Sequence, residues 1–451
     1  MKLERFDAIV WSVLGLIGLV VVGVILIGDQ VGARIVRTLP ESNGSVSATG
    51  RVVIEFAQEM DRASVESGFS LEPTLNGRSF WQGKALTFVP DQPFARATTY
   101  TAQLAAGVRS ANGQTIKQTV IWQFTVREPA VIYIAPASES RELWSLSKGT
   151  ANPLTATGGA IYDFAVAPNG DRVAYSVANK QSGLDLWLMN RAGSNQRVLV
   201  ECAADRCTAP SWAPASDRLA YSRETVSGVA GGPHSPPRVW ILDLSTGQTA
   251  PLYQDSQLLG YGPAWSPDGK YIAAWDGSVG SIRDLDLQTN ETILLPSQSG
   301  APGSWSPDGQ TMLFNDLSLV GEQPYVKMFL AEFATKQIRP AFAAETQVSD
   351  YGAPVWSPDG QWVAAGVKTP TSGLGSQLWI LHPDGTKGRT VADDPRYTYG
   401  AYRWSPWSDS LIFQRFELGV PFAKPEILWW SAADNSVQVL ATDASLPAWL
   451  P

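Results

Sequence analysis

The chain has 451 residues, a formal net charge of −8 and a sequence pI near 5.0. This negative balance argues against nucleic acid as a partner, because binding a phosphate backbone requires a basic patch. Charged residues make up only 17% of the chain, whereas 40 glycines, 31 prolines and 18 tryptophans supply turns and packing surfaces. We therefore expect an all-β, extracytoplasmic protein.

An apolar segment lies near the amino end. Ala8 to Gly28 contains 21 residues and no charge, which is enough for a helix to cross a hydrocarbon core of roughly 30 Å. Cleavage near Val31-Gly32-Ala33 is the alternative. We favour an uncleaved, single-pass transmembrane helix with the amino terminus inside, because little of the chain precedes it. Residues 1–38 are thus assigned to a membrane anchor and a short linker.

Residues 39–128 predict a small β-sandwich. Apolar residues alternate in several short runs, such as Val52, Ile54 and Phe56, as they do in strands with one buried face. Turn signals such as Asn76-Gly77 and Asn112-Gly113 separate these runs.

A tryptophan-centred motif recurs through the rest of the chain. A proline follows two residues after the tryptophan, and three copies continue with Asp-Gly, which reverses a strand at low conformational cost. Successive copies lie 40 to 53 residues apart, which is the length of a four-stranded propeller blade. The copies are Ser211 to Pro214, Ala264 to Pro267, Ser304 to Pro307, Val355 to Pro358 and Arg403 to Pro406, with a degenerate one at Val166 to Pro168 and a truncated one at Ala448 to Pro451.

A second periodic pair predicts how the ring closes. An apolar residue followed by an aromatic one, as in Leu143-Trp144 and Leu428-Trp429, first occurs before the first tryptophan motif. Residues 131–157 therefore supply three strands of a blade whose innermost strand is Leu446 to Leu450. We expect residues 129–451 to form a seven-bladed propeller closed by both of its ends. A six-bladed ring is the alternative, but it leaves strand edges unpaired.

Both predicted domains resemble known families. The segments Phe56 to Asp61, Leu86 to Pro90 and Trp122 to Thr125 resemble the bacterial Ig-like domain named after the SbsA surface-layer protein. The Trp-Ser-Pro-Asp-Gly repeats resemble the TolB-type propeller repeat, which also occurs in the propellers of prolyl-oligopeptidase-like proteins. The TolB family has six blades, whereas seven are counted here. The resemblance implies an envelope protein with a binding propeller and identifies no ligand.

Cys202 and Cys207 are the only cysteines. An even pair in an exported chain favours a disulfide, and two reduced thiols in a surface loop are the alternative. Two thiolates without a nearby histidine leave a zinc tetrahedron unfilled, so no metal site is expected.

Residues that carry catalytic chemistry are few. His234 and His382 are the only histidines, and neither has a nucleophile partner in the sequence. Asp268, Asp308 and Asp359 supply one carboxylate per blade, which turn formation explains and which falls short of the roughly six to eight oxygens that calcium requires. We also expect no hydrolase domain of the kind that prolyl-oligopeptidase-like proteins carry beside their propellers. We therefore expect a protein that is not an enzyme and has no cofactor.

One face of the predicted propeller carries the longer connections, such as Arg223 to Arg238 and Arg415 to Pro425. Long loops on a rigid scaffold are the usual place for recognition. Tyrosines recur where the innermost strands begin at this face, and they either bind a ligand or only cap their blades. The candidate ligand-binding residues are Tyr162, Tyr261, Tyr351, Tyr397, Tyr399 and Tyr402, with Asp350, Asp393 and Asp394 beside them.

Tyrosine rings with nearby carboxylates suit a protein, peptide or glycan partner. We therefore expect a membrane-tethered binding or assembly protein that presents its propeller to such a partner. Two alternatives come from other classes. One is a glycan-active lyase or hydrolase, which needs carboxylates about 5 to 10 Å apart. The other is a purely structural spacer of the cell envelope.

Overall fold

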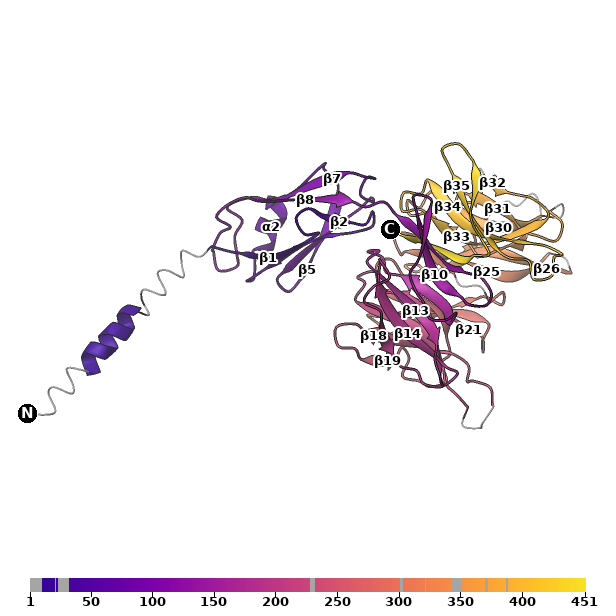
Figure 1. Ribbon diagram of the computed structural model, residues 1–451, viewed down its shortest axis with the longest axis horizontal. Helices are drawn as coiled ribbons and strands as arrows, with labels where there is room; N and C mark the ends of the chain where they lie inside the picture. Colours follow the sequence, from indigo (N-terminus) through magenta and orange to yellow (C-terminus); the bar gives the residue numbers. More distant parts are fainter. Residues whose placement is uncertain are drawn as a thin grey trace, which may run out of the picture. The chain divides into compact units, whose positions relative to one another are not determined.

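The computed structural model describes residues 10–20, 22, 32–227, 232–300, 303–320, 322–342, 350–369, 372–386 and 388–451. The chain divides into two compact units, Met1–Arg127 and Glu128–Pro451. Figure 1 draws the strands of unit 1 in indigo to purple and those of unit 2 in purple to yellow. Residues 10–20 and 22 are helical, and the remainder of the predicted span from Ala8 to Gly28 lies outside the described residues. Among the described residues, no helix has the length and apolar character needed to cross a membrane.

Unit 1 contains two four-stranded sheets. Both follow from the predicted alternation, because Val52, Ile54 and Phe56 are buried on one face of their strand. The first sheet has the order β1 (Ile35–Leu39), β3 (Val52–Phe56), β6 (Ala85–Pro90) and β5 (Gly77–Gln82), and the second has the order β2 (Gly44–Val46), β8 (Val120–Val126), β7 (Thr99–Leu104) and β4 (Phe69–Glu72).

A single hydrophobic core joins the two sheets of unit 1. The ring of Phe94 is fully buried, with its centroid 5.0 Å from that of Tyr100 and 5.6 Å from that of Phe124. Each fully buried side chain of this kind contributes about 2 to 3 kcal/mol. The core therefore gives unit 1 an independent source of stability.

Two local features of unit 1 differ from the sequence expectation. Strand β1 begins at Ile35, within the stretch assigned to the linker. A short helix, α2 (Arg62–Gly68), occurs where no helix is expected. The side chain of Asp61 caps it by accepting a hydrogen bond from the backbone N–H of Ser64 at 3.3 Å. Seven residues are too few for a helical period to stand out in the sequence.

The described strands of unit 2 form antiparallel meanders, here called groups, that have four strands each except for one with five. One parallel pair, Leu184 with Arg206, links the second group to the third. The first three groups are β37 (Ser445–Leu450), β9 (Ala130–Ala135), β10 (Glu142–Ser147) and β11 (Thr150–Pro153); β12 (Ile161–Val166), β13 (Arg172–Ala178), β14 (Leu184–Asn190) and β15 (Arg197–Val200); and β16 (Arg206–Trp212), β17 (Arg218–Glu224), β18 (Arg238–Asp243) and β19 (Thr249–Pro251).

The remaining groups follow the same order along the chain. They are β20 (Tyr261–Trp265), β21 (Tyr271–Asp276), β22 (Ser281–Asp286) and β23 (Thr292–Pro296); β24 (Ser304–Trp305), β25 (Thr311–Val320), β26 (Gln323–Glu332) and β27 (Gln337–Pro340); β28 (Asp350–Tyr351) with β29 (Val355–Trp356), β30 (Val363–Lys368), β31 (Gln377–Leu381) and β32 (Arg389–Ala392); and β33 (Tyr397–Trp404), β34 (Ser410–Glu417), β35 (Glu426–Ser431) and β36 (Val437–Thr442).

The last strand of the chain completes the first group of unit 2. Strand β37 pairs antiparallel with β9, with Trp449 opposite Val131 and Leu450 opposite Ala130. Figure 1 marks the carboxyl end beside the purple strands of this group, near β10. Leu450 is 1% exposed, so the end of the chain lies in the core. The predicted closure by the carboxyl-terminal strand is confirmed.

The serine and aspartate of the repeated turn bond to each other. In three copies the serine hydroxyl donates to the aspartate Oδ1 two residues later, at 2.6 Å from Ser266, 2.6 Å from Ser306 and 2.5 Å from Ser357. The same hydroxyls accept the backbone N–H that opens the next strand, as for Tyr271 at 2.9 Å. These bonds fix the turn, which is the role that the sequence predicts for the aspartates.

The repeated tryptophans connect neighbouring groups. Each indole Nε1 donates to a backbone carbonyl in the first strand of the preceding group, as from Trp265 to Ser211 at 3.2 Å. The same bond runs from Trp212 to Ala165, from Trp305 to Ala264, from Trp404 to Val355 and from Trp449 to Arg403. Trp356 is the exception, since its Nε1 is buried without a partner. Packing between groups therefore accounts for the tryptophan series.

Candidate binding site at the start of the inner strands

The first strand of each group, here called an inner strand, positions the candidate site. Successive inner strands contact one another around most of the ring, and β37 contacts both β33 and β12. Strands β12, β16, β20, β33 and β37 each contain a bulge near their start. A bulge shifts the side-chain alternation by one residue and redirects the side chains before it. The side chains before the bulge therefore do not continue the alternation between the two faces that the side chains after it show.

A disulfide loop precedes the inner strand β16. Cys202 and Cys207 form a disulfide, as the sequence favours, and both are buried. Between them, the carboxylate of Asp205 accepts hydrogen bonds from Arg223 Nε at 2.8 Å and from the backbone N–H of Val226 at 2.9 Å. The loop thus fixes both the start of β16 and the connection after β17. Arg206, next to Cys207, is held in place by this arrangement.

Arg206 lies beside two of the predicted tyrosines. Its guanidinium carbon is 5.6 Å from the ring centroid of Tyr162, which is a cation–π distance. Its Nη1 is 3.8 Å from a carboxylate oxygen of Glu224. Tyr261 opens the neighbouring inner strand and interacts electrostatically with both Tyr162 and Arg206. We call Tyr162, Asp163, Arg206, Glu224 and Tyr261 the tyrosine–arginine cluster.

The cluster presents aromatic surface to solvent. Tyr162 is 38% exposed and Tyr261 is 41% exposed. Burial raises the pKa of Tyr261, and the nearby Tyr162 and Asp163 raise it further, so its hydroxyl remains a neutral donor at physiological pH. Two half-exposed rings beside one guanidinium suit a ligand with an apolar or aromatic side chain and a carboxylate.

Asp163 anchors the cluster rather than reaching out of it. Its Oδ1 accepts a short hydrogen bond from Ser176 Oγ, and its Oδ2 accepts the backbone N–H of Ala209 at 2.6 Å. Burial raises its pKa against the opposing effect of these hydrogen bonds. The carboxylate therefore joins two neighbouring inner strands.

Two other predicted pairs lie in separate places. Asp350 accepts the backbone N–H of Val326 at 2.8 Å, and the half-buried ring of Tyr351 packs edge-on against Phe342 at 5.1 Å. These contacts hold the start of β28 against the long hairpin of β25 and β26. The sequence predicts a long connection from Asn315 to Tyr325, and strands β25 and β26 occupy part of it.

Tyr397 opens β33 and lies between two arginines. Its ring centroid is 4.0 Å from the guanidinium carbon of Arg415 and 5.4 Å from that of Arg396. Asp394 accepts from Arg396 Nη2 at 2.7 Å, and this hydrogen bond lowers the pKa of the carboxyl to about 2. Asp393 is exposed beside this pair.

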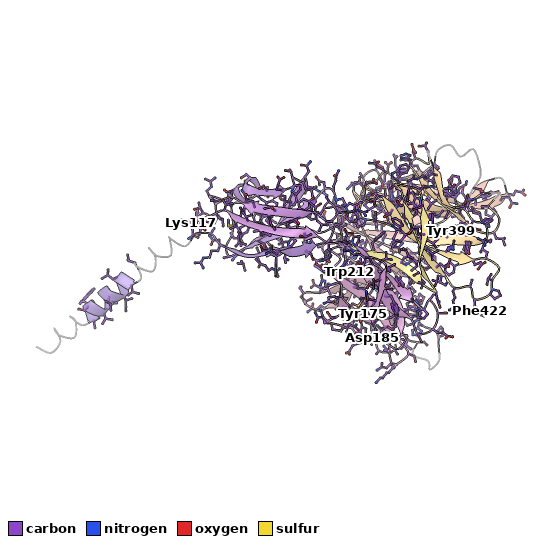
Figure 2. The ribbon with its side chains drawn as sticks, turned by 45° about the horizontal axis from the view of Figure 1, so that its top comes forward. Lys117, Tyr175, Asp185, Trp212, Tyr399 and Phe422 are labelled. Carbon is purple, nitrogen blue, oxygen red and sulfur yellow. A yellow bond between two sulfur atoms is a disulfide. The ribbon has the colours of Figure 1, made fainter. Side chains whose placement is uncertain are left out.

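Tyr399 and Tyr402 do not belong to the surface. They are 6% and 4% exposed, and the hydroxyl of Tyr402 donates to the backbone carbonyl of Tyr399 at 2.8 Å. Figure 2 labels Tyr399 among the side chains of the yellow strands. The prediction that these two rings stand at the mouth of the propeller is wrong. That prediction placed the tyrosines by their distance from the tryptophan motif, and this distance does not determine whether a ring is buried. The ring of Tyr399 packs edge-on against Phe413, with centroids 6.1 Å apart.

Arg206 and Glu224 are the residues of the cluster that sequence reasoning missed. Each lies at a position where the other repeats carry a different residue type, so no periodicity marks them. Their signal is local, since Arg206 is adjacent to Cys207 and the register of β16 and β17 places it opposite Glu224. In this chain the position next to a disulfide cysteine at the start of an inner strand is the sequence signal that could have indicated Arg206.

The two histidines lie away from the cluster's rings. His382 stacks on Trp362 with centroids 4.2 Å apart, and its Nδ1 is 3.1 Å from the carbonyl of Gln361. His234 Nε2 is 3.2 Å from the carbonyl of Ala204, so it ties the connection after β17 to the disulfide loop. Both contacts are of a structural kind.

Comparisons with known proteins agree with this architecture. Residues 29–126 match the family of bacterial Ig-like domains. The chain is 25% identical to the uncharacterized peptidase YuxL of Bacillus subtilis in a match that covers 35% of this chain and 28% of that protein. The chain therefore matches less than a third of this relative's length.

Two solved structures are similar to the chain. TolB from Acinetobacter baumannii is 16% identical, with a TM-score of 0.43 and coverage of 85% of this chain and 83% of TolB. Puromycin hydrolase is 14% identical, with a TM-score of 0.53 and coverage of 78% of this chain and 53% of the hydrolase. At this identity the second likeness shows a shared fold.

The expectation that the protein is not an enzyme is contradicted by these comparisons. The curated relative is a peptidase, and a hydrolase shares the fold. The expectation relied on the missing catalytic motifs of the repeats, but repeats describe a scaffold and do not determine the chemistry with which that scaffold is combined.

The matched domain, the tryptophan repeats and the shared fold lead to one conclusion. Residues 29–126 match the bacterial Ig-like domain family, and the strands that follow have a β-propeller fold whose repeats resemble the TolB-type repeat.

Proposed function

We propose that this protein binds a polypeptide partner outside the cytoplasm through the tyrosine–arginine cluster of a seven-bladed propeller. The segment from Ala8 to Gly28 serves as its membrane anchor, and the Ig-like domain serves as a spacer. The apolar composition of that segment supports the membrane anchor, and the grouping of the strands in unit 2 supports the seven-bladed propeller.

The observation that carries the proposal is the cluster itself. Tyr162, Arg206 and Tyr261 come from three successive inner strands and stay partly exposed. The disulfide loop fixes Arg206 before any partner arrives, so little ordering entropy is lost on binding. Aromatic residues and arginine are the types that dominate the binding energy of protein interfaces.

Substitution of the two rings tests the site. The full chain carrying Tyr162→Ala and Tyr261→Ala should lose partner capture by about tenfold or more in envelope extracts, because each lost aromatic anchor costs on the order of 1 to 2 kcal/mol. Capture is measured by crosslinking to the tagged protein, followed by identification of the crosslinked peptide.

A matched control uses two exposed rings outside the cluster. Phe416, near the end of β34, is 40% exposed, and Phe422, labelled in Figure 2, is fully exposed in the connection between β34 and β35. Phe416→Ala with Phe422→Ala should leave capture unchanged. Equal capture by both double variants would place the partner elsewhere and refute the site.

A second candidate function comes from the similarity to YuxL and to the puromycin hydrolase fold. In this function the propeller admits peptides to a peptidase activity, and the same cluster holds the peptide. Release of fluorescence from a quenched peptide library by the purified full chain would support it. Loss of that release in the double tyrosine variant would assign the cluster to substrate binding.

A further inference from the structure

A groove runs along one side of unit 1, between the first strand and the last. It has a volume of about 600 Å³, and its lining includes Arg34, Val36, Lys117, Ile121 and Trp122. Every lining residue belongs to unit 1. The groove is therefore independent of the tyrosine–arginine cluster. A volume of this size is typical of ligand sites.

Strand pairing explains why the groove exists. Ala33 N donates to Thr115 O at 3.0 Å, ahead of the last strand β8, and Asn43 N donates to Gln123 O within β8 at 2.7 Å. Between these points the chain crosses to the other sheet, where β1 pairs with β3. Within the described residues, no strand pairs the outer side of β8 before Gly44 meets Phe124.

The uncovered stretch comprises residues 117–119, which lead into β8, and residues 120–122, which begin it. Fully extended, this stretch would span about 20 Å at roughly 3.3 Å per residue. An open edge of this kind presents unpaired backbone N–H and C=O groups to any extended chain that enters. The groove can therefore accept a segment of about five residues by strand addition.

The side chains around this edge are also incompletely satisfied. Trp122 is 3% exposed, and its Nε1 is buried without a hydrogen-bond partner. Val36 and Ile121 are 63% and 58% exposed, which is high for apolar residues. An incoming chain would cover the side chains of Val36 and Ile121.

Charge selects the occupant. Arg34, Arg37 and Lys117 all line the groove, and within the described ranges Arg34 and Lys117 form no ion pair. Arg37 is 3.6 Å from Glu55. The rim is therefore cationic in a chain whose net charge is −8. A second copy of this chain would bring the same cations against each other, so charge disfavours it as the occupant.

We propose that this groove binds an extended segment of a partner polypeptide, with acidic side chains alternating with apolar ones, by adding it as a strand to β8. The apolar side chains cover Val36 and Ile121. The acidic side chains face Arg34 and Lys117 at the rim, and the backbone pairs with residues 117–122.

A synthetic peptide tests the proposal with the full chain. The probe is a fluorescent heptapeptide of alternating valine and glutamate, acetylated and amidated at its ends, and binding is followed by fluorescence anisotropy. Its counterpart alternates valine and lysine and should bind about tenfold more weakly or worse, because its charges repel the rim. Hydrogen exchange should show new protection of residues 117–122 on binding.

Charge reversal on the protein gives the matched comparison. Arg34→Glu with Lys117→Glu should weaken binding of the glutamate peptide about tenfold and improve binding of the lysine peptide. Arg78→Glu with Arg96→Glu, at two exposed positions outside the lining of the groove, should leave both affinities unchanged. All four positions are exposed, so the fold should be retained, which thermal unfolding checks.

Several outcomes overturn the proposal. These are the absence of binding up to millimolar peptide, equal affinity for the two peptides, or affinities that do not respond to Arg34→Glu with Lys117→Glu. Self-association of the full chain that this double variant abolishes, seen by sedimentation equilibrium, would instead make a second copy the occupant.

Discussion

The two units of this protein treat the edges of their sheets in opposite ways. Unit 2 takes its last strand, β37, and pairs it with its first, β9, so that both ends of the chain segment are covered. Unit 1 divides its first strand between two sheets and leaves half of β8 uncovered. An unpaired edge invites another chain, whereas a paired edge excludes one.

This difference separates two kinds of recognition. In unit 2 the closing strand β37 fills the edge of β9, and the partly exposed side chains of Tyr162, Arg206 and Tyr261 form the candidate recognition surface. In unit 1 the backbone itself is available, and side chains select among extended segments. The first kind favours a folded or shaped partner, and the second favours a strand.

Removing the closing strand should have the largest effect. A chain that ends at Thr442 loses the buried Leu450 and the bond from Trp449 to Arg403 and leaves β9 with an open edge. We expect unit 2 to lose about 5 kcal/mol or more of its unfolding free energy. Denaturant titration with tryptophan fluorescence measures this loss, and the transition of unit 1 serves as the internal control.

A peptide of residues 443–451 added in trans should restore part of that stability, because it supplies the missing strand. An unaltered unfolding midpoint in the truncated chain would mean that β37 does not seal the ring.

Substitution of the buried Asp284 in β22 should give a smaller effect on the free energy of unfolding, and this effect should depend on pH. Asp284 is fully buried opposite Ala273 and Ile293, and both of its carboxylate oxygens lack a partner, so burial raises its pKa well above 3.8. The unfolded chain then releases the proton first, so this residue's contribution to stability is complete below about pH 4 and falls as the pH rises toward the folded-state pKa.

Asp284→Asn removes this titration. The free energy of unfolding of the variant should exceed that of the wild type by a margin that grows as the pH rises from 4 to 8, measured by denaturant titration at each pH. A margin that stays constant over this range would show that the carboxyl is not desolvated.

The indole bonds between groups should give the smallest effect. Trp265→Phe removes the hydrogen bond to Ser211 and should cost about 1 kcal/mol through that bond. Trp356→Phe is the matched control, since its Nε1 is buried without a partner and no hydrogen bond is lost. Equal losses in the two variants, measured by thermal unfolding, would rule out a contribution from the indole bonds.

Much of the fold follows from the sequence. The tryptophan motif locates the inner strands, and the early apolar–aromatic pair at Leu143-Trp144 leads to the closure by β37. Both are consequences of a repeat, in which one supersecondary unit is copied and each copy packs on its neighbour. Helix α2 could not be found in this way, because a single short helix has no period.

The candidate site was predictable only in part. Tyr162 and Tyr261 are exposed as expected, whereas Tyr399 and Tyr402 lie in the core. Bulges do not separate the two cases, because β12, β20 and β33 all contain one. The distance from the tryptophan motif locates a tyrosine along its strand, but the surrounding residues determine whether its ring is buried. Arg206 joins the site through the disulfide and the register of β16, and neither geometry is visible as a motif.

Amide hydrogen exchange on the full chain compares the two edges directly. Residues 130–134 and 445–450 should exchange together and as slowly as the global unfolding of unit 2 allows. Residues 120–122 should exchange faster than residues 124–126 of the same strand, β8. Rapid exchange of residues 445–450, or equal protection along the whole of β8, would contradict the account of a sealed ring beside an open edge.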